Sequence, residues 1–244
     1  MCRMFGMVAG RPVSARDVLR DAPRGMRTLA HEHADGWGIA VHAQGGWLVH
    51  RSTNCAARCQ RYDELAACVE GRLVIAHVRK KTVGEVSLLN THPFQRGRFV
   101  FAHNGTVKDV NALRARTSVD QLAQLEGDTD SERLFAFVLT FVDALGDTRL
   151  GVAAAVRALH SLGDIGTANF LMSDGTHLYA HRLGQSLFAL AREGVSMIAS
   201  EPLTDEPWTA LPERALVVLP ALDQQTAEPA EVPGLDELPL LRTA

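Results

Sequence analysis

The sequence contains few cysteines, no excess of charge of one sign and no long apolar run. Four cysteines in 244 residues do not look like a disulfide framework. No stretch approaches the roughly 18 apolar residues of a membrane span, and the N-terminus carries no signal-like apolar core. The net charge of -3 gives no reason to expect nucleic acid or an anionic membrane as partner. We therefore expect a cytoplasmic protein with neither nucleic acid nor a membrane among its partners.

The apolar segments are short and numerous. The chain is 46% hydrophobic, which suits a single domain over residues 1–244 with a loosely ordered, Pro- and Glu-rich tail from about residue 224. Segments typical of strands are 2–9, 35–42, 47–51, 72–79, 99–104, 169–172, 177–181, 186–191, 196–200 and 216–219. Helices are expected at 14–29, 52–70, 129–142 and 151–162. This order predicts an α+β domain of two antiparallel sheets with helices outside.

The second residue of the chain is a cysteine. Removal of Met1 leaves Cys2 with a thiol and a free α-amine on one residue. The amine, with a reference pKa of about 7.7–8.0, can take the thiol proton near neutral pH. Cys2 is therefore a candidate nucleophile that carries its own base.

A second candidate segment ends the predicted strand 72–79. Arg79 lies at the strand end, where its guanidinium can grip a carboxylate through two hydrogen bonds. Thr82 can add a hydroxyl to the same carboxylate. An ordinary surface arginine is the alternative reading of Arg79 taken alone.

A third segment pairs Asn104 with Gly105 after the predicted strand 99–104, where we expect a turn. Acyl transfer needs hydrogen-bond donors for the oxygen that becomes negative, and the Asn104 amide and the Gly105 N–H are suitable donors. Asn-Gly is also a common turn dipeptide, which is the simpler reading.

A fourth segment, Gly127 to Glu132, has the pattern of a helix start. Asp128 or Thr129 can cap the helix, with Glu132 in its first turn. That reading leaves Asp130 as an anion able to hold a substrate ammonium.

The motifs occur in the order of a known family. They are Cys2, His77-x-Arg79-x2-Thr82, Asn90-Thr91-His92-Pro93-Phe94, His103-Asn104-Gly105 and Asp128-Thr129-Asp130-Ser131-Glu132. This set resembles the class II glutamine amidotransferases, in particular their short stand-alone members, and spans about residues 2–202. The family belongs to the Ntn hydrolases, so the resemblance implies a four-layer αββα sandwich.

The resemblance also implies a role for each candidate. Cys2 would attack the side-chain amide of glutamine, and Asn104 with the Gly105 N–H would stabilise the oxyanion. Arg79 and Thr82 would bind the α-carboxylate, and Asp130 the α-ammonium. Water would then hydrolyse a γ-glutamyl thioester. Either a synthase acting in trans would receive the ammonia, or the protein would simply hydrolyse a γ-glutamyl bond.

One difference from the family pattern leaves the identity of the substrate undecided. Synthase-linked members often have a histidine where this chain has Val83. The chain is also similar to the γ-glutamyl hydrolases of ergothioneine biosynthesis, so a γ-glutamyl compound other than glutamine is an alternative substrate. A non-catalytic glutamine-binding subunit and an acylase with another acyl group are further alternatives.

The remaining cysteines and histidines do not form a metal-ligand pattern. Cys55, Cys59 and Cys68 lie in the predicted helix 52–70, where helical spacing favours buried structural thiols. We read His31 and His33 as part of a loop that enters a strand. We expect no metal and no cofactor. His77 and His103 are read as structural hydrogen-bonding groups, and His92 as a residue that fixes the loop 80–97.

Overall fold

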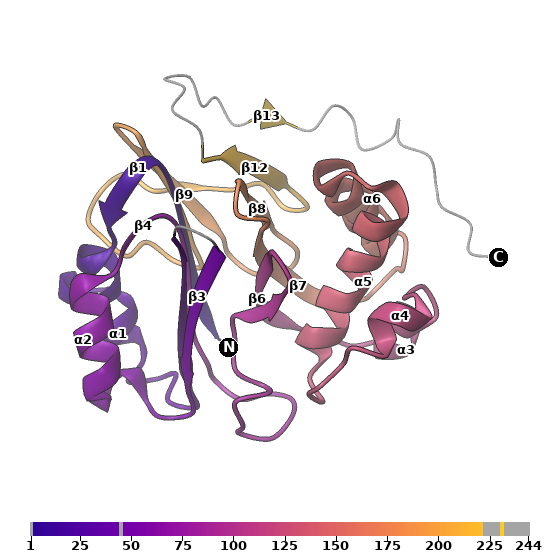
Figure 1. Cartoon of the computed structure of the whole chain (residues 1–244), viewed down its shortest axis with the longest axis horizontal. Helices are drawn as coiled ribbons and strands as arrows, with labels where there is room; N and C mark the ends of the chain where they lie inside the picture. The colour runs from indigo at the N-terminus through magenta and orange to yellow at the C-terminus, as the bar shows by residue number, and fades with distance from the viewer. Residues whose placement is uncertain (1, 44–45, 222–229, 232–244) are drawn as a thin grey trace.

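Two antiparallel sheets pack face to face, with helices on both outer faces (Figure 1). The computed structural model describes residues 2–43, 46–221 and 230–231. In Figure 1, α1 and α2 cover one sheet, and α5 and α6 cover the other. The predicted α+β sandwich with four layers is confirmed.

The first sheet carries the N-terminal strand at its interior. Across this sheet, within the described residues, the strands are β11 (Thr209–Ala210), β9 (Phe188–Arg192), β10 (Val195–Ala199), β1 (Arg3–Ser14), β4 (Glu70–Val78), β2 (Trp37–Ala43) and β3 (Gly46–Ser52). Strand β1 is paired on both sides, with Phe5 opposite Ala199 of β10 and Ala76 of β4. The start of the chain is therefore held by two neighbouring strands.

The second sheet carries the Asn-Gly segment. Its described strands, in order across the sheet, are β13 (Ala230–Glu231), β12 (Leu216–Pro220), β8 (His177–His181), β7 (Gly166–Ser173), β6 (Phe99–Val107) and β5 (Phe94–Arg96). Strand β6 pairs with β7, and Asn104 lies opposite Asn169.

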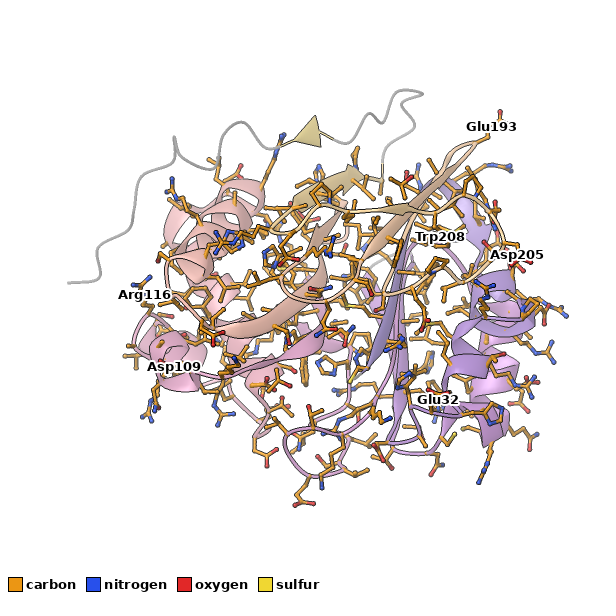
Figure 2. The ribbon with its side chains drawn as sticks, turned by 180° about the vertical axis from the view of Figure 1, so that it is seen from behind. Glu32, Asp109, Arg116, Glu193, Asp205 and Trp208 are labelled. Atoms are coloured by element: carbon orange, nitrogen blue, oxygen red, sulfur yellow. The ribbon has the colours of Figure 1, made fainter. Side chains whose placement is uncertain are left out.

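Side chains of the central strands are buried on both faces, which explains the near-continuous apolar runs in the sequence. In β1, Phe5 and Met7 pack toward α1 and α2, whereas Met4 and Val8 face the other sheet. In β6, Phe101 packs toward α5, whereas Val100 and Ala102 face the first sheet. These alternations follow the two-residue period of a strand. The layers so formed are filled with side chains (Figure 2).

The main helices have well-defined ends. Helix α5 (Asp130–Leu145) is capped by Thr129, whose hydroxyl accepts a hydrogen bond from the Glu132 N–H. It ends at Gly146, which has a left-handed backbone. Helix α6 (Thr148–His160) begins after the capping residue Asp147. None of the described helices is long and apolar enough to cross a bilayer.

Several predicted elements differ from the structure. Residues 14–29 form a π-helical turn (Asp17–Asp21) and the short helix α1 (Met26–Leu29). The helix predicted over 52–70 is α2 (Gln60–Cys68), preceded by a 3₁₀ turn (Ala56–Arg58). Two short helices, α3 (Val110–Arg114) and α4 (Val119–Leu122), lie between β6 and α5.

Two further predictions were wrong in part. Gly105 lies inside β6 and forms no turn, because it is paired with Ala168 of β7 and the pairing of the two strands continues to Val107. Cys68 is exposed at the end of α2, so it is not a buried thiol. The expected loose tail falls mainly on residues outside the described part of the chain, although Ala230–Glu231 pair with β12.

Gly151 sets the separation of α5 and α6. A Cβ atom added at Gly151 would overlap the Cα of Val142 and lie 2.8 Å from its backbone nitrogen. Backbone atoms cannot move aside as a side chain does.

We predict that Gly151→Ala lowers the free energy of unfolding by about 1–3 kcal/mol, the range of overpacking, measured by chemical denaturation. The neighbouring Leu150→Ala, at a 44% exposed position, should change it by less than about 0.5 kcal/mol. Equal stability of Gly151→Ala and the wild type would contradict this account.

Candidate active site

Cys2 directly precedes β1, and Asn104 lies on β6, which faces β1 across the inter-sheet layer. Cys2 precedes Met4 by two residues, and Asn104 follows Ala102 by two, so strand periodicity places both with residues of that layer. Asn104 is only 3% exposed. The two sheets also meet directly here, since the His77 Nε2 lies 3.2 Å from the His103 carbonyl oxygen.

The Cys2 thiol contacts the backbone of Lys80, two residues after the end of β4. Its Sγ lies 3.4 Å from both the N–H and the carbonyl oxygen of Lys80. Burial raises the pKa of the Cys2 thiol above its usual value, and the Asp130 carboxylate raises it further. The Lys80 N–H and the Arg79 charge act in the opposite direction. Arg79 and Asp130 therefore both act electrostatically on the thiol, and the net effect favours the protonated form at neutral pH.

Arg79 organises the segment that follows it. Its side chain is 3% exposed and donates to the carbonyl oxygens of Val83 and Glu85, each at 3.1 Å. The guanidinium still has further N–H donors for a ligand. The reading of Arg79 as an ordinary surface residue is therefore wrong.

The rest of the segment 80–90 is anchored at its two ends. The Lys81 N–H donates to the Asp35 carboxylate at 2.7 Å. Asn90 donates to Asp128 and accepts from its N–H at 3.1 Å. Thr82 is exposed, and its hydroxyl forms no hydrogen bond within the described residues. Arg79 is thus buried and hydrogen-bonded, whereas the Thr82 side chain is exposed to solvent.

Gly105 allows β6 and β7 to approach closely. A Cβ atom at this position would overlap the carbonyl group of Thr167 and lie 2.8 Å from the His103 Nε2. Glycine is therefore required for packing. Its neighbour Asn104 donates from Nδ2 to the Ser200 hydroxyl at 3.4 Å, and its Oδ1 is buried without a partner in the described residues.

Asp130 is buried at the first turn of α5. Its Oδ2 accepts from the Val107 N–H of β6 at 2.7 Å, and the Ser131 hydroxyl lies 3.5 Å from its Oδ1. The positive end of the helix favours a carboxylate at this position. Asp130 thus combines a role in fixing α5 to β6 with a charge that reaches Cys2.

Buried histidines surround this region. His77 and His92 have ring centroids 4.3 Å apart, and neither ring nitrogen of His92 has a partner in the described residues. Burial lowers the pKa of His77 to about 3 and that of His33 to about 4. Burial also lowers the pKa of His103, whose Nδ1 lies 2.8 Å from the Ser131 hydroxyl. These rings are neutral at physiological pH.

Ser200 is the contact residue that sequence reasoning missed. It is 3% exposed, directly follows β10, and touches both Met4 and Asn104. The available signal was a polar residue ending a buried strand, which indicates a hydrogen-bonding partner but does not say which one.

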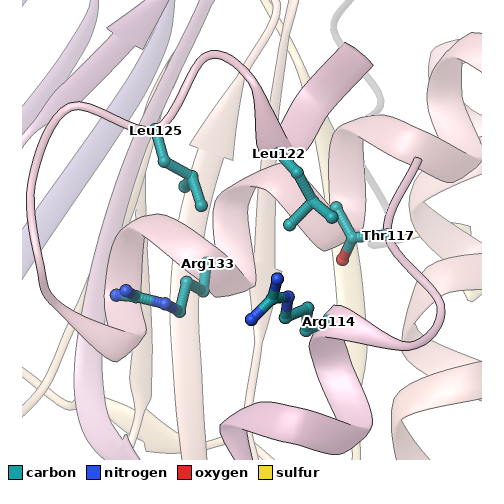
Figure 3. Close-up of a pocket in the computed structure, with 5 residues that line it drawn as sticks. All are labelled: Arg114, Thr117, Leu122, Leu125 and Arg133. Atoms are coloured by element: carbon teal, nitrogen blue, oxygen red, sulfur yellow. The ribbon is translucent and has the colours of Figure 1, made fainter. Parts of the chain in front are cut away.

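A small cavity lies away from this region, outside α5. It has a volume of about 160 Å³ and is lined by Arg114, Thr117, Leu122, Leu125 and Arg133 (Figure 3). Arg133 donates to the Thr129 carbonyl at 2.9 Å, and Thr117 to that of Leu113 at 2.8 Å. The described residues contain no cluster of three potential metal ligands.

Comparison with known proteins identifies the family. Residues 1–194 match the family model described as class II glutamine amidotransferases. The chain therefore belongs to the class II glutamine amidotransferases, and it is an amide-hydrolysing enzyme.

Its relatives include both hydrolases and amidotransferases. The chain is 30% identical over 231 residues to the gamma-glutamyl-hercynylcysteine sulfoxide hydrolase of Mycobacterium tuberculosis, covering 89% of this chain and 92% of that protein. A class II glutamine aminotransferase domain protein from Silicibacter pomeroyi superposes with a TM-score of 0.66 at 21% identity, covering 90% of this chain and 94% of that one. The glutamine phosphoribosylpyrophosphate amidotransferase of Bacillus subtilis gives 0.67 at 17% identity, over 89% of this chain and 47% of that one. The two structures share the fold.

The buried neutral histidines predict a loss of stability in acid. In the unfolded chain an imidazole binds a proton below about pH 6.5, whereas buried His77 and His33 stay neutral to about pH 3 and 4. The unfolded state therefore binds more protons in between. The free energy of unfolding should fall from pH 6.5 toward pH 4 by up to about 1.4 kcal/mol per pH unit for each such histidine. Chemical denaturation across this range measures the slope.

Removal of one histidine tests the assignment. His77→Gln can keep the hydrogen bond to the His103 carbonyl but cannot titrate, so the slope should decrease. His31→Gln, at an exposed position, controls for the loss of an imidazole. An unchanged slope in His77→Gln would mean that this ring does not contribute.

Proposed function

We propose that the protein hydrolyses the γ-amide of glutamine to glutamate and ammonia, with Cys2 as the nucleophile after removal of Met1. The observation that carries this proposal is the convergence on one thiol of the Arg79 and Asp130 charges and the Lys80 N–H. Asn104 faces the same inter-sheet layer. A cation and an anion beside a nucleophile suit the two charges of a free amino-acid end.

The chemistry follows from these positions. The α-amine of Cys2 takes the thiol proton, and Sγ attacks the amide carbon to form a C–S bond. Asn104 and the Gly105 N–H donate to the resulting oxyanion. The protonated amine then gives its proton to the leaving nitrogen, the C–N bond breaks and ammonia departs. Water attacks the γ-glutamyl thioester, the C–S bond breaks and the thiol is regenerated.

The substrate is held through its amino-acid end in this proposal. The Arg79 donors that do not hold the segment 83–85 would bind the α-carboxylate, and Asp130 would bind the α-ammonium. Thr82 would reach the carboxylate only if its exposed side chain turns toward the site. An ammonia-accepting synthase in trans, a cytoplasmic location and a single domain belong to the same proposal.

Substitution of the nucleophile tests the mechanism. We predict that Cys2→Ala reduces glutamate release to background, because no other group can form the thioester, while the melting temperature stays close to that of the wild type. Cys68→Ala is the matched control, because this thiol is exposed and donates to the Leu65 carbonyl of its own helix. An N-terminal extension that keeps Cys2 internal should silence the enzyme in the same way. Full activity in Cys2→Ala would refute the mechanism.

A second candidate substrate is favoured by one observation. The sulfoxide hydrolase relative covers nearly the whole chain at 30% identity. On this alternative the enzyme hydrolyses a larger γ-glutamyl compound, such as the γ-glutamyl intermediate of the ergothioneine pathway. The catalytic steps are the same, and only the leaving group differs.

A substrate panel separates the two candidates. The Met1-processed protein is offered L-glutamine and a series of γ-glutamyl amides and thioethers, and glutamate release is measured. Fast turnover of glutamine is expected for a glutaminase, and turnover of one larger compound without glutamine for a dedicated hydrolase. Val83→His tests whether this position sets the preference. Absence of turnover across the panel would count against both candidates.

A further inference from the structure

Ser200 joins the two sheets at the site. It lies outside residues 1–194, the part of the chain that matches the family model. Continuation of the β1–β10 register places it opposite Met4, two residues after Cys2. It is 3% exposed. Its hydroxyl therefore has to find its partners within the protein.

The Ser200 side chain replaces a ladder hydrogen bond. Residues opposite each other in an antiparallel pair can exchange two N–H to carbonyl bonds. Here the Ser200 N–H donates to the Met4 carbonyl at 3.1 Å, but the Met4 N–H donates to the Ser200 hydroxyl oxygen at 3.0 Å. The Ser200 carbonyl instead accepts from the Ser186 hydroxyl at 2.8 Å. Thus a side-chain atom fixes the backbone next to Cys2.

The same hydroxyl orients the Asn104 amide. Its hydrogen points to the Met4 carbonyl at 3.4 Å, so its oxygen is left to accept from the Asn104 Nδ2, also at 3.4 Å. One Nδ2 hydrogen is used in this way and the other is free for a ligand. Both distances are long for hydrogen bonds, so these contacts favour one orientation of the amide but restrain it only weakly.

Other residues support Ser200 in this position. The Asn169 Nδ2 donates to the Gln185 and Ser186 carbonyls at 3.1 and 3.0 Å, and its Oδ1 accepts from the Leu183 N–H at 2.7 Å. These bonds fix the segment that carries the Ser186 hydroxyl. Asn169 therefore supports Ser200 indirectly, through the Ser186 hydroxyl that donates to the Ser200 carbonyl.

We propose that Ser200 is a positioning residue, which holds the Asn104 amide in register with β1, the strand that directly follows Cys2. This inference rests on the proposed function, in which Asn104 donates to the oxyanion. Without the hydroxyl, the Met4 N–H and the Asn104 amide both lose their acceptor, and the amide is free to rotate away from the developing charge. The effect falls on the transition state, because the hydrogen-bond partners of Ser200 in the described residues are Met4, Asn104 and Ser186, and not the proposed substrate-binding residues.

Steady-state kinetics on the best substrate test the proposal. Ser200→Ala should lower kcat by about 10- to 100-fold, the range for a misplaced donor, and change KM by less than about threefold. Ser200→Thr keeps the hydroxyl and should recover most of kcat. Ser173→Ala is the matched control: this serine is buried at the far end of β7, and its hydroxyl accepts from Gly175. A kcat in Ser200→Ala equal to that of Ser173→Ala would overturn the proposal.

A double substitution separates positioning from a general structural effect. If Ser200 acts through Asn104, then Ser200→Ala added to Asn104→Ala should cause little further loss of kcat. Multiplication of the two losses would overturn the proposal.

A measurement that needs no turnover separates this proposal from the proposed function. The Asn104 side-chain amide resonance, assigned by its absence in Asn104→Ala, should shift and broaden in Ser200→Ala and stay in place in Ser173→Ala. An unmoved resonance would overturn the positioning role. A moved resonance in a protein without activity on any γ-glutamyl compound would refute the proposed function alone.

Discussion

Face-to-face packing of the two sheets fixes the distance between the strand that follows Cys2 and the strand that carries Asn104. Met4 and Ile75 on one sheet meet Ala102 and Leu171 on the other, and all four are fully buried. Gly6 belongs to the same layer, because a Cβ there would press on Leu171 and Leu178. At the end of this apolar layer the contacts become polar. The site is therefore the polar margin of the core, and its geometry inherits the rigidity of packed strands.

This location explains the electrostatics of the thiol. The layer beneath Cys2 excludes water, so burial raises the thiol pKa, and nearby charges act with little screening. The histidines around it are neutral for the same reason. Arg79 and Asp130 are side-chain charges that act on the thiol pKa with opposite sign. A ligand that neutralises only the Arg79 charge would raise the thiol pKa, and one that neutralises only the Asp130 charge would lower it.

Strand and helix order were predictable from the sequence because the apolar periods are strong in β1, β4, β6 and α5. The α+β class followed from the same pattern, whereas the candidate residues followed from their motifs and from the family resemblance. Local signals were weaker where tertiary packing decides: Gly105 has the sequence of a turn, yet the Thr167 carbonyl makes it a close-packed strand residue. Thr82 was predicted to bind the same ligand carboxylate as Arg79, but its side chain is exposed. Arg79 itself donates to the backbone carbonyls of Val83 and Glu85, which the sequence did not indicate. Ser200 could not be found, since its partners Met4 and Asn104 are remote in sequence.

The hydrogen bonds of Arg79 to Val83 and Glu85 make this residue a structural hub as well as a charge. A lysine in its place would keep the positive charge but lose the planar fork that spans two carbonyls. Kinetic changes in any Arg79 variant would therefore mix a loss of ligand affinity with a rearrangement of the segment between Lys80 and Asn90. A ligand that takes Arg79 N–H donors from those two carbonyls would weaken the attachment of the segment between Lys80 and Asn90. By thermodynamic reciprocity, a change that stabilises this segment would alter the affinity for the ligand.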